Sequence, residues 1–196
     1  MDKHCLSMVE SLPVSDMPVE DPTITKDKQH REQPRLIIVM GVCGCGKSTI
    51  ASALAKKLNG MYLDADDYHP DTNIAKMRRG EALTDEDRWP WLQQFAENMA
   101  QHEGIVVGAC SALRHHYREC ITQAANESVL FVFADGSKTL IRQRMQARQG
   151  HFMPDSLLDS QFAILERPQA SEHAISVDIS GSVDDIVQTV LIHLTE

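Results

Sequence analysis

Residues 41–48 of the chain read GVCGCGKS, which fits the pattern G-x-x-x-x-G-K-[ST] of a phosphate-binding P-loop. The apolar run Leu36–Met40 stands directly before this motif and predicts a buried strand. Directly after it, apolar residues recur at helical spacing over residues 48–58. Strand, glycine-rich loop and helix are the context that the motif requires, so a chance glycine-rich turn is a poor alternative.

The chemistry of this motif depends on its backbone and on two side chains. Glycines allow backbone N–H groups to curl around phosphate oxygens, and the following helix presents its positive end to the same phosphates. Lys47 supplies a mobile charge for the β- and γ-phosphates, and the Ser48 hydroxyl can ligate Mg²⁺. The expected nucleotide-binding residues are Gly41, Val42, Cys43, Gly44, Cys45, Gly46, Lys47, Ser48 and Thr49.

Composition limits the class of protein. The chain has 196 residues and a net charge of −9, which argues against nucleic acid as the main partner because phosphate backbones need clustered lysine and arginine. No stretch approaches the ~18 apolar residues of a membrane span, and the N-terminus lacks the pattern of a secretory signal. The five cysteines form no zinc spacing and no disulfide framework. We therefore expect a cytoplasmic location and no membrane partner.

Two regions differ in pattern. Residues 1–34 contain several prolines, many charges and no sustained periodicity, and we interpret them as a flexible N-terminal tail. Residues 35–196 alternate between apolar runs and helical patterns, which predicts one α/β domain. Strands are expected over residues 36–40, 61–64, 105–109, 129–133 and 174–179, and helices over residues 48–58, 91–100, 112–124, 138–148 and 183–194. The prediction is a three-layer fold with a five-stranded parallel sheet, whose ligands bind at the carboxyl ends of the strands.

Acidic residues follow the second expected strand. Asp64, Asp66 and Asp67 place carboxylates beside the P-loop edge of the sheet. One carboxylate can hold Mg²⁺ or its waters, and another can accept the proton of a hydroxyl that attacks the γ-phosphate. A solvated acidic turn is the alternative, which the position at a strand end makes the weaker one.

Basic residues lie in two further segments. Arg78 and Arg79 can grip an anionic substrate, although a solvated helical face also explains them. Residues 142–148 carry three arginines and precede a glycine and a proline, which predicts a mobile lid over about residues 148–156. Lid arginines close over a triphosphate and exclude water. A helix end that complements its own dipole is the alternative.

Together these segments resemble the gluconate kinases, small P-loop sugar-acid kinases related to nucleoside monophosphate kinases. The matching segments are residues 40–48, 64–70, 73–80, 83–88, 90–92, 110–118, 150–154, 160–162 and 165–168. The resemblance spans about residues 36–195. It implies a P-loop NTPase fold with a small lid, and ATP-dependent phosphorylation of D-gluconate at its 6-hydroxyl with Mg²⁺ as cofactor. The implied partner is a small sugar acid, and a homodimer is one assembly that the sequence leaves open.

The motifs and the resemblance together imply roles for individual residues. Lys47, Asp66 and Arg148 are the expected catalytic residues. Arg144 is expected to bind ATP, and Ser48 and Asp64 to bind the metal. The expected substrate-binding residues are Asp66, His69, Arg78, Ser111, Arg118, His151 and Gln161.

The chain departs from the usual family pattern at four positions. Cys43 and Cys45 replace serines, Ala65 replaces a glycine, and Arg114 replaces a lysine. The reaction class is unaffected by these changes, which bear on substrate preference. Another small-molecule kinase of this fold, such as a shikimate or nucleotide kinase, and a catalytically silent P-loop module are the alternatives. A GTPase switch would need an N-K-x-D motif, which is absent from the sequence.

The two P-loop cysteines allow a redox hypothesis. Lys47 and the start of the helix would lower the pKa of a nearby thiol, and an oxidised loop could not close around phosphate. The alternative is that both cysteines replace serines of similar size and face away from solvent, and we favour this alternative.

Overall fold

The computed structural model describes residues 34–147 and 155–195, which belong to one compact unit. Its elements are β1 (Leu36–Met40), α1 (Lys47–Lys57), β2 (Met61–Asp64), η1 (Ala65–Tyr68), α2 (Asp71–Arg78), α3 (Asp85–Gln101), β3 (Val106–Ala109), α4 (His115–Ala125), β4 (Val129–Asp135), α5 (Lys138–Ala147), α6 (Asp155–Ile164), β5 (Ala174–Asp178) and α7 (Val183–Thr195). Apart from Pro34, the expected tail lies outside the described residues, as does most of the expected lid.

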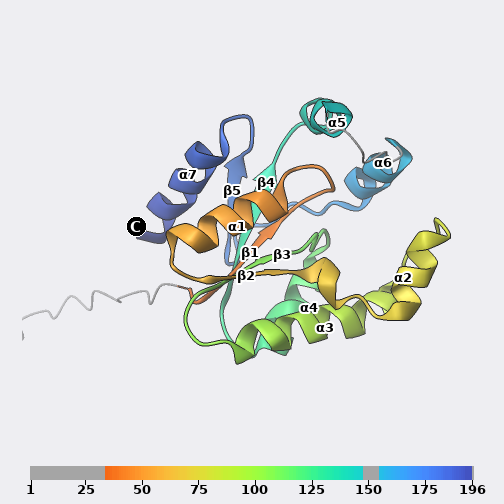
Figure 1. Cartoon of the computed structure of the whole chain (residues 1–196), viewed down its shortest axis with the longest axis horizontal. Helices are drawn as coiled ribbons and strands as arrows, with labels where there is room; N and C mark the ends of the chain where they lie inside the picture. Colours follow the sequence, from red (N-terminus) through yellow and green to blue (C-terminus); the bar gives the residue numbers. More distant parts are fainter. Residues whose placement is uncertain (1–33, 148–154, 196) are drawn as a thin grey trace, which may run out of the picture. The chain divides into compact units, whose positions relative to one another are not determined.

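The strands form one parallel sheet in the order β2-β3-β1-β4-β5, as Figure 1 shows. β1 is the central strand, and its Leu36 pairs in register with Val106 of β3 and Val129 of β4. Because all strands run in the same direction, their carboxyl ends share one edge of the sheet. The three-layer α/β fold expected from the sequence is confirmed, and ligands of such sheets bind at this edge.

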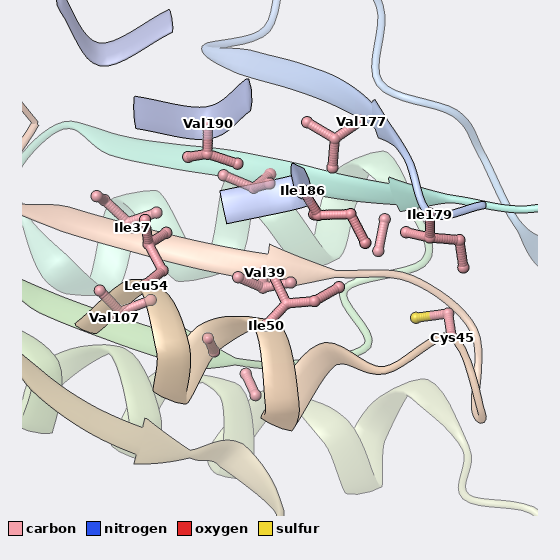
Figure 2. Packing of buried hydrophobic residues seen from close by; sticks show 14 of the residues in the cluster. Ile37, Val39, Cys45, Ile50, Leu54, Val107, Val177, Ile179, Ile186 and Val190 are labelled. Carbon is pink, nitrogen blue, oxygen red and sulfur yellow. The ribbon is translucent and has the colours of Figure 1, made fainter. Parts of the chain in front are cut away.

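Alternate residues of β1 enter two separate hydrophobic clusters, because successive side chains of a strand point to opposite faces. Ile37 and Val39 pack against buried residues of α1 and α7 (Figure 2). Leu36, Ile38 and Met40 pack against buried residues of α3 and α4. Figure 1 shows these two pairs of helices on opposite sides of the sheet. The sheet is therefore covered on both faces, as its continuous apolar strands require.

Helix α3 begins at Asp85, well before residue 91 where the sequence predicts its start. Thr84 and Asp87 form a capping box, in which each side chain accepts a hydrogen bond from the backbone N–H of the other residue. Pro90 lies inside the helix and has no N–H to donate. A proline at this position is a signal against a helix in the residues before it. The cap stabilises the first turn in spite of the proline.

Helices α2 and α6 and the 3₁₀ turn η1 are additional to the helices and strands expected from the sequence. α6 follows the expected lid in the chain, and η1 follows β2 at the carboxyl edge of the sheet. Within residues 34–147 and 155–195, no helix combines the length and the apolar character needed to cross a membrane.

Candidate active site

The P-loop joins β1 to α1 at the carboxyl edge of the sheet. Gly41, Gly44 and Gly46 have φ values of +142°, +76° and +100°, a region that residues with a Cβ rarely adopt. Gly46 is the N-cap of α1, and no described side chain caps this helix. The backbone N–H groups of the first turn are therefore free to bind an anion at the positive end of the helix.

Helices α5 and α6, on either side of the expected lid, both contact the P-loop. A Cβ on Gly44 would lie 2.5 Å from Cγ of Met145 in α5, so a larger residue here would displace that side chain. Gln161 of α6 accepts a hydrogen bond of 2.6 Å from the backbone N–H of Cys43. A movement of either helix would therefore change the contacts that hold the phosphate-binding loop.

Ser48 and Asp64 meet between α1 and β2. The Ser48 hydroxyl donates a hydrogen bond of 2.9 Å to Oδ2 of Asp64, and the Tyr62 hydroxyl donates one of 2.7 Å to the same oxygen. Burial, and then the bond to Asp64, raises the pKa of Tyr62 to about 12, so this hydroxyl stays protonated. Sequence reasoning missed Tyr62; the signal is its place two residues before Asp64, on the same face of the strand.

The oxygen ligands of this pair suit Mg²⁺, which prefers hard oxygen donors. Among the described residues, no group of three or more His, Cys, Asp and Glu side chains could hold a metal ion. Mg²⁺ is usually held by one or two protein ligands together with substrate phosphates and water. Ser48 and Asp64 therefore fit the predicted metal site.

Asp66 lies in η1, beside Asp64. Its backbone N–H donates a hydrogen bond of 3.2 Å to Oδ1 of Asp64. Crowding by protein atoms, and then the Asp64 charge, raises the pKa of Asp66, whereas Lys47 lowers it. Since 87% of the Asp66 side chain is exposed, solvent moderates this effect. The Lys47 ammonium group donates to the Val42 carbonyl at 3.1 Å and so lies over the P-loop, within electrostatic reach of Asp66.

His69 is held in place beside Asp66. Its ring stacks on Trp91 with centroids 4.0 Å apart, and the Trp91 indole N–H donates to the carbonyl of Ala65 at 2.6 Å. Nε2 of His69 lies 4.0 Å from Oδ1 of Asp66. Burial is the main cause that lowers the pKa of His69, so the imidazole is neutral at physiological pH. A neutral, fixed imidazole beside Asp66 is suited to hydrogen bonding with a substrate hydroxyl.

The two P-loop cysteines do not have the environment that the redox hypothesis requires. Burial raises the pKa of the Cys43 thiol, and the opposing effect of Lys47 is smaller. Cys45 is 0% exposed and points into the core near Ile50 (Figure 2). The predicted lowering of the Cys43 pKa is therefore wrong, and the alternative of inert serine replacements is the better one.

We expect peroxide to inhibit the wild type and a Cys43→Ser/Cys45→Ser double variant to the same degree, with or without ATP. The reason is that a protonated or buried thiol is a poor nucleophile. Residual activity after peroxide treatment is the measurement. Inhibition that ATP prevents in the wild type, and that is absent from the double variant, would contradict this expectation.

The structure corrects the assignment of Arg118 to substrate binding. Its side chain is 2% exposed, and its guanidinium donates to the Glu172 carboxylate at 2.5 and 2.9 Å. Two further bonds, both 3.1 Å long, reach the backbone carbonyls of Ala112 and Glu166. Ala112 has a φ of +41°, which is strained for a residue with a Cβ. Arg118 thus stabilises the loop after β3 from inside the protein and is closed to a substrate.

Ser111 and Arg144 lie near the P-loop edge of the sheet. The Ser111 carbonyl accepts a hydrogen bond of 3.2 Å from the backbone N–H of Gly41, so the loop after β3 touches the start of the P-loop. Arg144 of α5 donates to the carbonyl of Ile179, just after β5. α5 therefore connects the P-loop with the loop after β5.

The other predicted residues are less fully described. Arg78 is exposed in the last turn of α2, and it forms no ion pair with any residue in the described part of the chain. Arg148 and His151 lie outside the described residues. Their expected roles on a lid remain predictions.

A parallel sheet with a P-loop after its central strand, and with Lys47, Ser48 and Asp64 at one edge, defines a P-loop kinase. The family model described as an AAA domain matches residues 36–168. The solved structure of the Mycobacterium tuberculosis APS kinase CysC has a TM-score of 0.61 at 17% identity, and shikimate kinase from Aquifex aeolicus has 0.52 at 16%. At such identities the similarity shows the fold alone.

The chain belongs to the gluconokinase family. It is 40% identical over 183 residues to a probable gluconokinase of Dictyostelium discoideum, a match that covers 87% of this chain and 92% of the relative. It is 42% identical over 157 residues to the thermosensitive gluconokinase of Escherichia coli K12, covering 77% and 82%. The crystal structure of a gluconokinase from Sinorhizobium meliloti 1021 matches with 41% identity and a TM-score of 0.77, covering 84% and 94%. The resemblance noted in the sequence is confirmed.

Proposed function

We propose that this protein transfers the γ-phosphoryl group of ATP to the 6-hydroxyl of D-gluconate, giving 6-phospho-D-gluconate and ADP. The main support is that Lys47, the Ser48–Asp64 pair and Asp66 meet at one edge of the sheet, in a chain whose relatives are gluconokinases. The P-loop side of this edge suits a triphosphate, and the Asp66 side suits an acceptor hydroxyl.

On the nucleotide side, the backbone N–H groups of residues 41–49 bind the phosphates, and Lys47 reaches the β- and γ-phosphates. Ser48 would hold Mg²⁺ with assistance from Asp64. The bound ion would supply positive charge against the negative charge that develops during phosphoryl transfer. Arg144 of α5, whose guanidinium group donates to the carbonyl of Ile179, binds the nucleotide from the α5 side.

On the acceptor side, Asp66 orients or deprotonates the attacking hydroxyl, a role that suits its exposed carboxyl group beside His69. Phosphoryl transfer passes through a loose transition state, so positioning matters more than basicity. The residues proposed to hold the substrate besides Asp66 are His69, Arg78, Ser111, His151 and Gln161. Arg148, on a closing lid with His151, stabilises the charge of the transition state.

We place this reaction in the cytoplasm, with a small molecule as the partner. The four described cysteines, including Cys43 and Cys45, are free thiols, as a reducing compartment favours. The net charge of −9 also disfavours nucleic acid as a partner.

An ADP-release assay over D-gluconate, other sugar acids, shikimate and nucleoside monophosphates tests this function. We expect gluconate to give the largest kcat/KM, turnover to stop when EDTA removes Mg²⁺, and phosphorus NMR to show a phosphate ester at the 6-position. Efficient turnover of shikimate or of a nucleoside monophosphate, with poor turnover of gluconate, would overturn the proposal.

A further inference from the structure

Two arginines from different helices share one carboxylate near the acceptor side of the site. Nη1 of Arg88, in α3, lies 3.3 Å from Oδ1 of Asp85, and Nη1 of Arg114, the N-cap of α4, lies 3.3 Å from Oδ2. The Tyr117 hydroxyl donates to Oδ1 of Asp85 at 2.5 Å. Both guanidinium groups also lie over the Tyr117 ring, 5.5 and 5.9 Å from its centroid. We call these four residues the arginine cluster.

The guanidinium groups of the cluster are less fully bonded than those of Arg118 and Arg79. Arg118 makes four hydrogen bonds, and Arg79 binds Glu81 through two, of 2.7 and 3.0 Å. Within the described residues, Arg88 and Arg114 make one bond each, of 3.3 Å, which is longer than the about 2.7–2.9 Å usual for such charged pairs. Most of their N–H donors therefore face no protein acceptor among these residues.

The cluster carries an excess positive charge. The hydrogen bond from Tyr117, together with the charges of Arg114 and Arg88, lowers the pKa of Asp85, which is therefore ionised at neutral pH. One carboxylate neutralises only one of the two guanidinium groups. His116, whose Nε2 lies 3.5 Å from Oδ2 of Asp85, adds no negative charge. The Arg88 and Arg114 side chains are 22% and 32% exposed, so a dissolved anion can reach them.

The cluster also lies close to the proposed acceptor residues. Arg88 and Trp91 are three residues apart in α3, hence on adjacent positions of one helical face, and Trp91 stacks on His69. After burial, which is the main cause, the charge of Arg88 further lowers the pKa of His69, so Arg88 lies within electrostatic reach of this ring. His69 in turn neighbours Asp66. His69 and Trp91 therefore lie between Asp66, the proposed base, and the arginine cluster.

We propose that Arg88 and Arg114, fixed by Asp85 and Tyr117, bind the carboxylate of the acid substrate and determine the preference for a sugar acid over a neutral analogue. This inference rests on the proposed function, because it names the residues that bind the carboxylate end of gluconate, opposite to the 6-hydroxyl. A guanidinium group matches a carboxylate with two parallel N–H donors.

The test compares D-gluconate with D-gluconamide, which has the same carbon chain and 6-hydroxyl but no charge. We measure KM and kcat for both compounds, and KM for ATP, in the wild type, Arg88→Gln, Arg114→Gln and Arg114→Lys. Arg79→Gln is the matched control, since Arg79 is exposed and paired with Glu81. Thermal melting of each variant reports whether the fold is retained.

We expect either glutamine variant to raise KM for gluconate by roughly 10- to 100-fold, the effect of losing a hydrogen bond to a charged group, while KM values for gluconamide and ATP stay unchanged. Arg114→Lys should keep most of the preference for the acid, and Arg79→Gln all of it. Equal losses for both compounds, or a preference that survives both glutamine variants and disappears in Arg78→Gln, would overturn the inference.

The two proposals fail separately. Wild type that phosphorylates gluconate and gluconamide equally well disproves the carboxylate site and leaves the proposed function standing. Wild type that prefers another sugar acid to gluconate disproves the proposed substrate, and the same comparison with that acid and its amide then decides the role of the arginine cluster.

Discussion

Replacement of Lys47 by alanine should lower kcat for gluconate phosphorylation by about 10²- to 10³-fold, the effect of removing one preorganised group that stabilises transition-state charge. Lys47 is placed to act in this way because its ammonium group lies over the P-loop, bonded to the Val42 carbonyl, and its charge reaches Asp66. No other described lysine is placed in the P-loop. A 10²-fold loss corresponds to about 3 kcal/mol of transition-state stabilisation.

The fold should tolerate this change, because the Lys47 side chain makes one hydrogen bond to a loop carbonyl and is half-buried. We expect the melting temperature of Lys47→Ala to stay close to that of the wild type. Lys56→Ala is the control, since Lys56 is exposed in the last turn of the same helix. Unchanged turnover in Lys47→Ala, or a loss of activity that only follows unfolding, would show that Lys47 is not part of the catalytic machinery.

Replacement of Arg118 by methionine should lower the free energy of unfolding by about 3–5 kcal/mol, as expected when one partner of a buried ion pair is removed. Glu172 is 8% exposed and would lose its guanidinium partner. The carbonyls of Ala112 and Glu166 would lose hydrogen bonds as well. Urea unfolding monitored by circular dichroism measures the change.

An exposed ion pair supplies the control for this prediction. Arg79→Met removes the partner of Glu81, and both side chains are more than half exposed, so we expect a change below about 1 kcal/mol. If Arg118→Met is as stable as the wild type but has a raised KM for gluconate, Arg118 binds substrate and our structural assignment is wrong.

Acid should weaken the same pair. Glu172 has its pKa lowered from 4.5 to about 2, chiefly by the hydrogen bonds from Arg118. A carboxyl group with a lowered pKa in the folded state stabilises the protein fully above its unfolded pKa, and this contribution is lost as the pH falls through the folded value. The free energy of unfolding should therefore decline between about pH 4.5 and 2, and Glu172→Gln should remove part of that decline.

The P-loop could be recognised in the sequence because its signals are local. The P-loop needs glycines with positive φ at set positions, then a lysine and a hydroxyl, and all of these are adjacent in the chain. Apolar runs long enough to be buried on both faces likewise identify parallel strands without knowledge of their order. Asp64 and Asp66 could be placed near the P-loop because a strand end determines the edge on which they lie.

Arg118 shows where local signals fail. A sequence shows an arginine one helical turn after Arg114, and the two are alike in charge. Tertiary packing buries Arg118 against Glu172, which lies far along the chain, while Arg114 stays partly exposed beside Asp85. Burial and partners of this kind depend on which segments meet in three dimensions, so spacing along one helix cannot distinguish a structural arginine from a ligand-binding one.

The sequence by itself determined the fold class, the P-loop and the family, because each depends on residue types at short, regular spacings. The tertiary structure alone decided how distant side chains combine: the bond from Tyr62 to Asp64, the raised pKa of Cys43, and the meeting of Arg88 and Arg114 on Asp85. The physical reason is that hydrogen bonds, desolvation and charge interactions act over a few ångströms in space and are independent of distance along the chain.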